Sequence, residues 1–444
     1  MRNKTFPQGI HLRYHKQATA GKPTVIAKAP AVAVVPLIQH VGAPCIPQIN
    51  VGDHVFMGQK IGDAEALITA PVHSPVSGKV IALEARFHVM RRDVLSVVIE
   101  NDGEDELYPD ITPHPDWERL DPDTLRKIIR EGGIVGMGGA AFPTHIKLAP
   151  QSDKSIDTVI INGAECEDYL TADHRLMVEH PEWVIGGALI ISHILGNLKI
   201  LVGIEANKPD ALTAIRQAAG VGGNISVIAL DTKYPQGGEK EMIKVLLDRE
   251  VPSGGLPSEA GVVVNNVATA AKIFELITTG MPLISRGVTI SGPGVNAPGN
   301  LIARIGTSIE ELISECGGYK GKIAKVIIGG PMTGISLFTT LVTLTKSIGG
   351  VVLMRHEDIS HEDPVVCIRC ARCVDACPVY LMPIALYHYS RSLNYDQAVE
   401  AYGLFDCIEC GCCSYVCPGR LPLVESIKHA KAEVNNKRQK QRGR

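Results

Sequence analysis

Short apolar runs broken by glycine, proline and aspartate occupy the first quarter of the chain. Between residues 30 and 101, the runs AVAVVPL, QINVGDHVFMGQKIG, APVHSPVSGKVIAL and LSVVIEND have the spacing of short strands joined by tight turns. We therefore predict a β domain over residues 29–115. A polar N-terminal leader without a core of its own is predicted before it, over residues 1–28.

The pattern changes near residue 116, where helical and strand segments begin to alternate. The helical segment DTLRKIIREG follows Asp121-Pro122, a pair suited to an N-cap and first turn. The strand segments DTVIING, LKILVGI and NISVIAL lie between later helical segments. Alternation with short connections predicts a parallel or mixed α/β sheet over residues 116–280. A smaller α+β unit with RGVTISG, SIEELISECGG and KVIIGGP is predicted over residues 281–350.

The C-terminal part carries two copies of the spacing C-x2-C-x2-C-x3-C-P. This spacing wraps two 4Fe-4S clusters, because three thiolates of one run bind one cluster and the fourth binds the other. We therefore predict a helical, ferredoxin-like domain with two clusters over residues 351–430. One cluster is predicted to bind Cys367, Cys370, Cys373 and Cys417, and the other Cys407, Cys410, Cys413 and Cys377.

Zinc is the alternative ligand for paired cysteines, because C-x2-C pairs also suit structural zinc sites. A third cysteine at this spacing has no role in a zinc site, so the pattern favours clusters. Cys412 falls outside the repeat and is predicted to be a small buried residue. The basic tail, residues 431–444, is predicted to be a solvated, disordered end, with attraction to anionic lipid as the minor alternative.

Composition narrows the class of protein. The chain has 444 residues, 45% hydrophobic and 20% charged, and a net charge of −3, as expected of a soluble globular protein with no general affinity for nucleic acid. The N-terminus lacks the apolar core of a signal peptide, and thiolates held for iron indicate a reducing compartment. Polar residues interrupt the apolar stretches 184–204 and 335–354, so any membrane association is expected to be peripheral.

A glycine-rich segment offers a place for a flat or anionic ligand. In GMGGAAFPTHIK the glycines let the backbone approach a ligand, Phe142 offers an aromatic face, and Lys147 offers a cation. Three further patches follow strands or open a helix: NGAECEDY from Asn162, YPQGGE from Tyr234, and NNVAT from Asn265. Ligands bind at such strand ends and helix starts in α/β sheets. The acidic residues of the second patch could equally be solvated loop charges.

Together the four patches resemble the flavin-binding subunit of respiratory complex I, whose motifs are G-R-G-G-A-G-F-P-T-G-x-K, N-x-D-E-x-E-P, Y-x-x-G-E-E and V-V-N-N-V-E-T. The resemblance implies a non-covalent FMN site made by Gly136, Gly138, Gly139, Lys147, Asn162, Glu165, Tyr234, Gly237, Asn265, Asn266 and Thr269. It also implies that NADH or NAD+ lies over the flavin near Phe142, Lys147, Glu167 and Glu239. Departures from the motifs include Met137, Ala164, Asp168 and Gly238.

The β-rich N-terminal segment resembles the barrel-sandwich hybrid of lipoyl and biotinyl carrier domains. Lys79 lacks the usual acidic or methionine neighbours of a modified lysine, so a structural cap is favoured over a lipoylated carrier. The full order is barrel-sandwich hybrid, α/β FMN/NADH domain, SLBB-like β-grasp unit and two-cluster domain. That order is similar to the RnfC component of the Rnf complex, and the resemblance covers nearly the whole chain.

This resemblance implies a NAD(H)-binding electron-transfer subunit of a membrane ion-translocating ferredoxin:NAD+ oxidoreductase. Hydride exchange between NAD(H) and FMN, with single electrons relayed by the two clusters, is cofactor chemistry, so no catalytic side chain is expected. The implied partners are other Rnf subunits, both integral membrane and ferredoxin-interacting ones, and no nucleic acid. The implied location is peripheral, on the cytoplasmic face of a prokaryotic membrane, and the coupling ion stays open between Na+ and H+.

Two other functions are consistent with the same residues. Cobalamin reductases of propanediol-utilising microcompartments share these modules, so a soluble NADH-dependent reductase of cobalamin or another acceptor is the main alternative. The third function is a non-enzymatic electron carrier, in which the flavin-like domain is an empty scaffold and only the clusters act. Such a protein would contain iron but no FMN.

Overall fold

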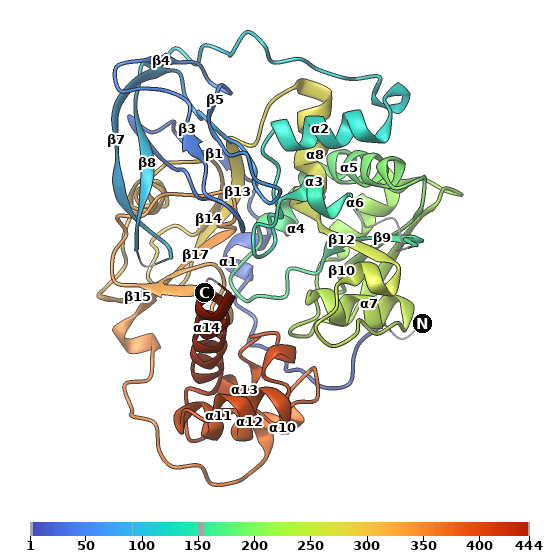
Figure 1. Ribbon diagram of the computed structural model, residues 1–444, viewed down its shortest axis with the longest axis vertical. Coiled ribbons are helices and arrows are strands. Elements are labelled where there is room, and N and C mark those ends of the chain that lie inside the picture. The colour runs from blue at the N-terminus through green and yellow to red at the C-terminus, as the bar shows by residue number, and fades with distance from the viewer. Residues whose placement is uncertain (1–2, 91, 150–154, 443–444) are drawn as a thin grey trace.

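The structure is a computed structural model that describes residues 3–90, 92–149 and 155–442. Figure 1 shows the N-terminal β domain beside a central α/β domain, with a second β-rich unit next to them. The cysteine-rich helical domain lies at one end of the molecule, and its last helix, α14 (Leu423–Arg442), points back toward the other domains.

The N-terminal β domain is built from two small antiparallel sheets around a core that includes Val35, Ile61 and Ile99. One sheet has the order β2 (Val32–Pro36), β8 (Arg92–Asn101), β7 (Gly78–His88) and β4 (His54–Val55). The other has the order β3 (Ile46–Pro47), β5 (Lys60–Asp63) and β6 (Val72–His73). Lys79 lies within β7, paired with β4 and β8, and not at a hairpin tip, which agrees with a structural role.

The central α/β domain has a parallel sheet in the order β11 (Ile225–Leu230), β10 (Lys199–Glu205), β9 (Thr158–Gly163) and β12 (Val262–Asn266). The predicted N-cap is present, because the Asp121 side chain accepts hydrogen bonds from the Asp123 and Thr124 amides. The helices around the sheet are α2 (Pro122–Glu131), α3 (Thr144–Lys147), α4 (Ala172–Glu179), α5 (Pro181–Ile194), α6 (Pro209–Ala219), α7 (Glu239–Leu247) and α8 (Val267–Thr279).

The second β-rich unit is a mixed sheet with helix α9 (Ile309–Glu315) packed in its core. The strand order is β1 (Val25–Ile26), β14 (Gly299–Arg304), β13 (Ser285–Ser291), β17 (Gly350–Arg355), β15 (Ile323–Ile328) and β16 (Ile335–Leu337). Strand β1 comes from the predicted leader, and Phe6 and Ile10 of the same leader are buried. The described part of the leader is therefore integrated into two other domains.

In the cysteine-rich domain, each cysteine run leads into a short helix and then a longer one. These pairs are α10 (Arg372–Asp375) with α11 (Pro383–Arg391), and α13 (Cys412–Tyr415) with α14; α12 (Tyr395–Glu400) lies between the pairs in sequence. The prediction of a disordered tail is wrong for residues 431–442, which continue α14. Two tail cations explain this order: Lys437 lies 5.1 Å from the Tyr395 ring centroid, and Arg438 lies 4.6 Å from that of Phe405. Residues 443–444 lie outside the described residues.

Among the described residues, no helix combines the length and the apolar composition that crossing a bilayer requires.

Lys346 ties three domains together. It lies in the second β-rich unit, is 1% exposed, and its ammonium group donates to the carbonyl oxygens of Pro71 and Gly133 at 2.6 and 2.7 Å. Pro71 belongs to the N-terminal β domain and Gly133 to the α/β domain. Burial lowers the pKa of Lys346 to about 7.

We predict that Lys346→Met destabilises the protein by about 1–3 kcal/mol, because two buried carbonyl groups lose their donor. The exposed Lys325→Met, in the same unit, is the matched control. The unfolded chain holds the Lys346 proton up to its ordinary pKa of 10.5, whereas the folded chain releases it above about 7. This group therefore adds stability as pH rises through that interval. Thermal unfolding across pH should lack this gain in Lys346→Met, and identical pH profiles would contradict the prediction.

Candidate functional site

The four predicted patches converge at the carboxyl edge of the parallel sheet. Strands β9 and β12 are neighbours, and their register places Asn162 opposite Asn266. The Asn162 side-chain amide donates to the Gly237 carbonyl at 2.8 Å, which brings in the third patch. The Asn266 side chain accepts from the Ala268 amide and so caps α8. Loops from distant parts of the sequence are thus held at one edge.

The glycine-rich loop lies directly against this edge. A Cβ added to Gly138 would be 2.7 Å from Asn266 Nδ2, so a larger residue would push the loop away. The Thr269 hydroxyl accepts a hydrogen bond from the Met137 amide at 2.9 Å and fixes the loop from the α8 side. Gly138 and Gly139 are exposed, so their backbone is open to a ligand.

A cavity of about 430 Å³ lies between this edge and the second β-rich unit. Its volume falls in the usual range of small-molecule and cofactor sites. The predicted residues that line it are Gly138, Gly139, Asn162, Glu165, Glu167, Gly237 and Asn266. The opposite wall comes from the second β-rich unit, chiefly Gly329, Gly330, Thr333, Gly334 and Ser347 to Gly349.

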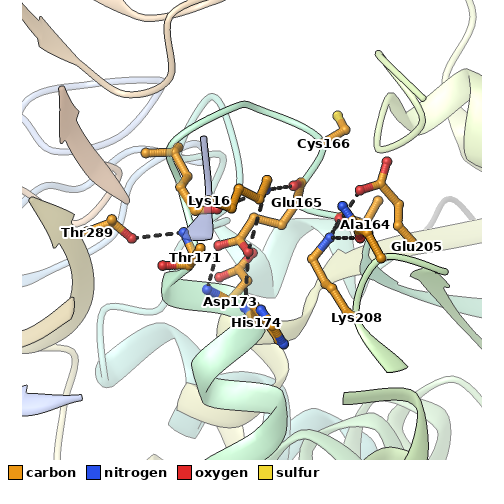
Figure 2. A network of polar contacts seen from close by, with 12 residues as sticks. Lys16, Ala164, Glu165, Cys166, Thr171, Asp173, His174, Glu205, Lys208 and Thr289 are labelled. Carbon is orange, nitrogen blue, oxygen red and sulfur yellow. Dashed lines mark hydrogen bonds and ion pairs between the residues drawn. The ribbon is translucent and has the colours of Figure 1, made fainter. Parts of the chain in front are cut away.

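Buried lysines hold the acidic loop that forms one wall of this cavity. Lys16, 4% exposed, donates to the carbonyl oxygens of Glu165 and Leu170, as Figure 2 shows around Glu165. Lys208, 1% exposed, donates to the carbonyl of Ala164 at 2.6 Å and to the carboxylate of Glu205 at 3.0 Å. Two cations from separate segments therefore fix the backbone of one loop.

Glu165 serves as a helix cap. Its carboxylate accepts from the backbone amides of Asp173 and His174, at 2.7 and 3.2 Å, at the start of α4 (Figure 2). Burial, followed by the charge of Glu165, raises the pKa of Asp173 to about 6. Asp173 accepts from the Asn266 amide at 2.6 Å, and both residues line the cavity.

Arg286 places a buried guanidinium on the same cavity. It is 3% exposed and donates to the Lys346 carbonyl at 2.6 Å. Burial lowers its pKa to about 10, so it stays charged at neutral pH. Arg286 lies on the cavity wall together with the Asp173 carboxyl group, whose negative charge it offsets. The same cation would also offset the negative charge of an anionic ligand in the cavity.

Glu167, predicted to bind nicotinamide nucleotide, has its carboxylate occupied by protein donors. It accepts from the Met332 amide at 3.0 Å and from the Thr333 amide and hydroxyl at 2.8 and 2.6 Å. Burial raises its pKa despite these bonds. Glu167 therefore joins the α/β domain to the turn before β16, and only part of its side chain lines the cavity.

The remaining predicted residues lie outside the cavity lining. Lys147 and Glu239 form an ion pair of 2.7 Å whose side chains are 32% and 41% exposed. Phe142 is half-buried in the glycine-rich loop, and Gly136 donates its amide to the Phe142 carbonyl. Thr269 supports the loop as described above. Asn265 is buried and Tyr234 contacts the cysteine-rich domain.

The predicted cluster ligands gather in two groups of four. The outer thiol group lines one cavity of the cysteine-rich domain and consists of Cys367, Cys370, Cys373 and Cys417. The inner thiol group consists of Cys377, Cys407, Cys410 and Cys413 and lines a smaller cavity, which Cys412 also lines. Each group thus brings three thiols of one run together with the fourth thiol of the other run. Across the described ranges, no three Cys, His, Asp or Glu side chains lie close enough to hold a single metal ion.

The residues present fit the implied groups. The side-chain amide nitrogen of Asn265 is buried without a hydrogen-bond partner in the described part of the chain, at the end of β12 next to Asn266, which lines the cavity. The Gly138 backbone provides a close approach that a Cβ would obstruct. Each thiol group presents the four sulfur ligands that a 4Fe-4S cluster takes. Cys412, predicted to be a small buried residue, is 0% exposed.

Sequence reasoning missed the residues contributed by the second β-rich unit. Gly329 and Gly330 follow a strand directly, so a glycine-rich strand end was available as a signal. No comparable signal identified Arg286 or Lys16, which are single cations in ordinary surroundings. Only the packing of separate domains brings Arg286 to the cavity wall and Lys16 to the loop behind it.

Comparison with known protein families identifies each part of the chain. Residues 4–104 match the RnfC barrel sandwich hybrid domain, and residues 129–275 match the Nuo51 FMN-binding domain. Residues 288–336 match the SLBB domain, and residues 360–418 match a 4Fe-4S dicluster domain. These matches confirm the predicted fold class, the order of the domains, and the presence of flavin and two-cluster domains.

Similar proteins span nearly the whole chain. It is 44% identical over 440 residues to the RnfC component of the Na+-translocating ferredoxin:NAD+ oxidoreductase complex of Acetobacterium woodii, which covers 99% of both chains. It is 42% identical to the corresponding component of the proton-translocating complex of Clostridium ljungdahlii, over 97% of this chain and 94% of that protein. It is 39% identical to that of the ion-translocating oxidoreductase complex of Pseudomonas aeruginosa, over 98% of this chain and 56% of that protein.

We predict that Asp173→Asn strengthens FMN binding at pH 7 severalfold and weakens its dependence on pH. In the wild type, protonation of Asp173 below about pH 6 removes a negative charge from the cavity wall, so binding should tighten as pH falls. Asparagine keeps the oxygen that accepts from Asn266. Fluorescence titration of FMN with apoprotein at pH 5 to 8 measures this. The exposed Asp93→Asn is the control for the change in charge. If the FMN affinity of Asp173→Asn depends on pH as strongly as that of the wild type, the prediction is refuted.

We predict that Cys417→Ser removes the cluster of the outer thiol group and leaves the inner one, although Cys417 belongs to the second run. Cys413→Ser, from the same run, should remove the inner cluster. Iron should fall from about eight to about four per chain in both variants, with different electron paramagnetic resonance (EPR) signals remaining. Cys412→Ala should keep both clusters. Loss of the same signal in Cys417→Ser and Cys413→Ser rules out the crossed arrangement.

Proposed function

This chain belongs to the RnfC family of ion-translocating ferredoxin:NAD+ oxidoreductase complexes, and on that premise we propose that it is the NAD(H)-binding electron-transfer subunit of such a complex. One observation carries the proposal. The cavity at the carboxyl edge of the sheet is lined by residues of all four motif patches, and the two groups of four thiols lie in the adjoining domain.

FMN bound in this cavity would exchange a hydride with NAD(H) and pass electrons singly to the two clusters. The protein's own contribution is placement and charge. Gly138 and Gly139 let the backbone come close to the ligand, and the amides of Asn162 and Asn266 fix the edge on which it rests. Arg286 offsets the negative charge of a phosphate-bearing ligand in a buried setting, where a cation is most effective.

The nucleotide is proposed to bind beside the glycine-rich loop, next to Phe142, Lys147 and Glu239. The ion pair between Lys147 and Glu239 is half-exposed, so its charged groups are accessible to the ribose and phosphates of a dinucleotide. Glu167 is proposed to act mainly by positioning the turn that closes the cavity, because its carboxylate already accepts three hydrogen bonds. No side chain is required as a proton donor or acceptor in hydride exchange.

The partners of the chain are the other subunits of the complex. We infer that the chain lies peripherally on the cytoplasmic face of the membrane, where NADH and NAD+ are available. Membrane-embedded subunits would then carry out ion transport. The proposed domains of the chain are 29–115, 116–280, 281–350 and 351–430; segment 1–28 packs on two of them, and the described part of segment 431–444 continues α14.

The test is anaerobic purification followed by flavin extraction, iron counting and NADH titration monitored by absorbance. FMN at about one and iron at about eight per chain, with bleaching by NADH, support the proposal. Iron without FMN, and no NADH oxidation with hexaammineruthenium(III), would exclude it in favour of a simple electron carrier. NADH oxidation that is faster with a cobalamin acceptor than with the reconstituted membrane complex would favour the soluble reductase.

We predict that Lys147→Met raises the KM for NADH by about 10- to 100-fold, because a hydrogen bond to a charged group contributes about 1.5–3 kcal/mol. FMN and iron content should stay at wild-type levels, since Lys147 does not line the flavin cavity. The exposed Lys127→Met, on α2, is the control. Steady-state kinetics with hexaammineruthenium(III) provide the measurement, and an unchanged KM removes Lys147 from the nucleotide site.

A further inference from the structure

Tyr234 is the point at which the α/β domain meets the inner thiol group. Its side chain is 2% exposed, and its hydroxyl group donates to the carbonyl oxygen of Cys410 at 2.8 Å. A hydroxyl has a single proton, and here it is committed to the cluster loop.

The segment that carries Tyr234 also forms part of the flavin cavity. Three residues further along, the Gly237 amide donates to Cys166 Sγ at 3.4 Å, and the Gly237 carbonyl accepts from Asn162. Gly237, Cys166 and Asn162 all line the cavity. A short, hydrogen-bonded stretch of chain therefore connects the cavity wall to the backbone of an inner cluster ligand.

A second contact reaches the same cluster loop from the opposite wall. A Cβ added to Gly411 would lie 3.1 Å from the Met332 carbonyl oxygen, so the loop is close to the turn before β16. The Met332 amide donates to Glu167, whose side chain lines the cavity. Tyr234, Met332, Cys166, Cys410 and Cys412 also share one apolar cluster.

The outer thiol group has no such connection. All residues that line its cavity in the described part of the chain lie between Pro364 and Leu423, within the cysteine-rich domain. Cys370 of this group is exposed, as are Val366 and Ile368 beside it. The inner group is therefore the one in contact with the domain that holds the flavin cavity.

We propose that Tyr234 is a positioning residue that holds the inner cluster loop against the flavin cavity, so that electrons enter the chain of clusters at the inner thiol group. The role rests on the proposed function and departs from the flavin contact that the motif resemblance implied for this residue. Tyr234 acts through the Cys410 backbone and touches neither reactant. The adjacent Glu409 amide donates to Cys407 Sγ at 3.4 Å, and hydrogen bonds to cluster sulfurs tune reduction potential.

The test is Tyr234→Phe, which keeps the ring and deletes the hydroxyl group. NADH oxidation with hexaammineruthenium(III), which takes electrons without the clusters, should stay at the wild-type rate. Cluster reduction by NADH in stopped-flow absorbance should slow by roughly 3- to 10-fold, the factor that corresponds to the loss of one neutral hydrogen bond. Redox titration followed by EPR should show a shifted midpoint for the inner cluster and an unchanged midpoint for the outer one.

Tyr389→Phe is the matched control, because it removes a hydroxyl group from α11 of the same domain, away from the α/β domain. Wild-type cluster reduction and wild-type midpoints in Tyr234→Phe overturn the proposal while the function of the chain stands. If Tyr234→Phe assembles incompletely, loss of the inner cluster alone supports the proposal, and loss of both clusters or of FMN overturns it. A wild type that is inactive with NADH refutes the proposed function itself.

Gly411→Ala perturbs the same junction from the other wall, because the added methyl group is crowded against the Met332 carbonyl. This variant should slow cluster reduction and shift the midpoint potential of the inner cluster, while the hydrogen bond from Tyr234 to Cys410 is kept. An effect of Gly411→Ala on the outer cluster alone would contradict the placement of the inner loop at the flavin cavity.

Discussion

Hydrogen bonds from buried cationic side chains to backbone carbonyl groups fix the loops around the cavity. Lys16, Lys208, Arg286 and Lys346 are each less than 5% exposed and donate to carbonyl oxygens of loops in other segments or domains. A buried ammonium or guanidinium group that lost these acceptors would remain desolvated, at a cost of several kcal/mol. The loops are therefore fixed in backbone conformations that they would not adopt alone, including positive φ at Glu165 and Tyr169.

The same arrangement determines the electrostatic character of the cavity. Of these groups, Arg286 lies on the cavity wall, and its carbonyl acceptor solvates the guanidinium without cancelling its charge, so positive charge stays available there for an anionic cofactor. Glu165 and Asp173 reduce that charge, but the Glu165 carboxylate is committed to the α4 N-terminus, and burial raises the pKa of Asp173 to about 6, so its contribution falls below that pH. A site of this kind is pre-organised for a phosphate-bearing ligand before the ligand arrives, because its donors are already fixed by the fold.

Local sequence signals were sufficient for much of the architecture. The cysteine spacing predicted the domain that matches a 4Fe-4S dicluster domain, and the Asp121 cap and the apolar strands of the α/β domain lie where the patterns predicted. The failures share one cause, which is contact between residues distant in sequence. The tail is helical because Tyr395 and Phe405 accept its cations, the leader is ordered because other domains bury Phe6 and Ile10, and Glu167 is occupied by a turn more than 160 residues away.

The departures from the complex I motifs have a physical basis in this fold. Glu241 Oε2 would clash with a Cβ on Gly238, so the Glu241 side chain fills the space where the motif has its first glutamate. Ala164 is fully buried beside Gly237, so a carboxylate at this position would have to be buried as well. Tyr234 keeps the motif residue but donates its only hydroxyl proton to Cys410. A motif therefore transfers the position of a residue between proteins, whereas its hydrogen-bond partners decide which ligand, cluster or loop that residue serves.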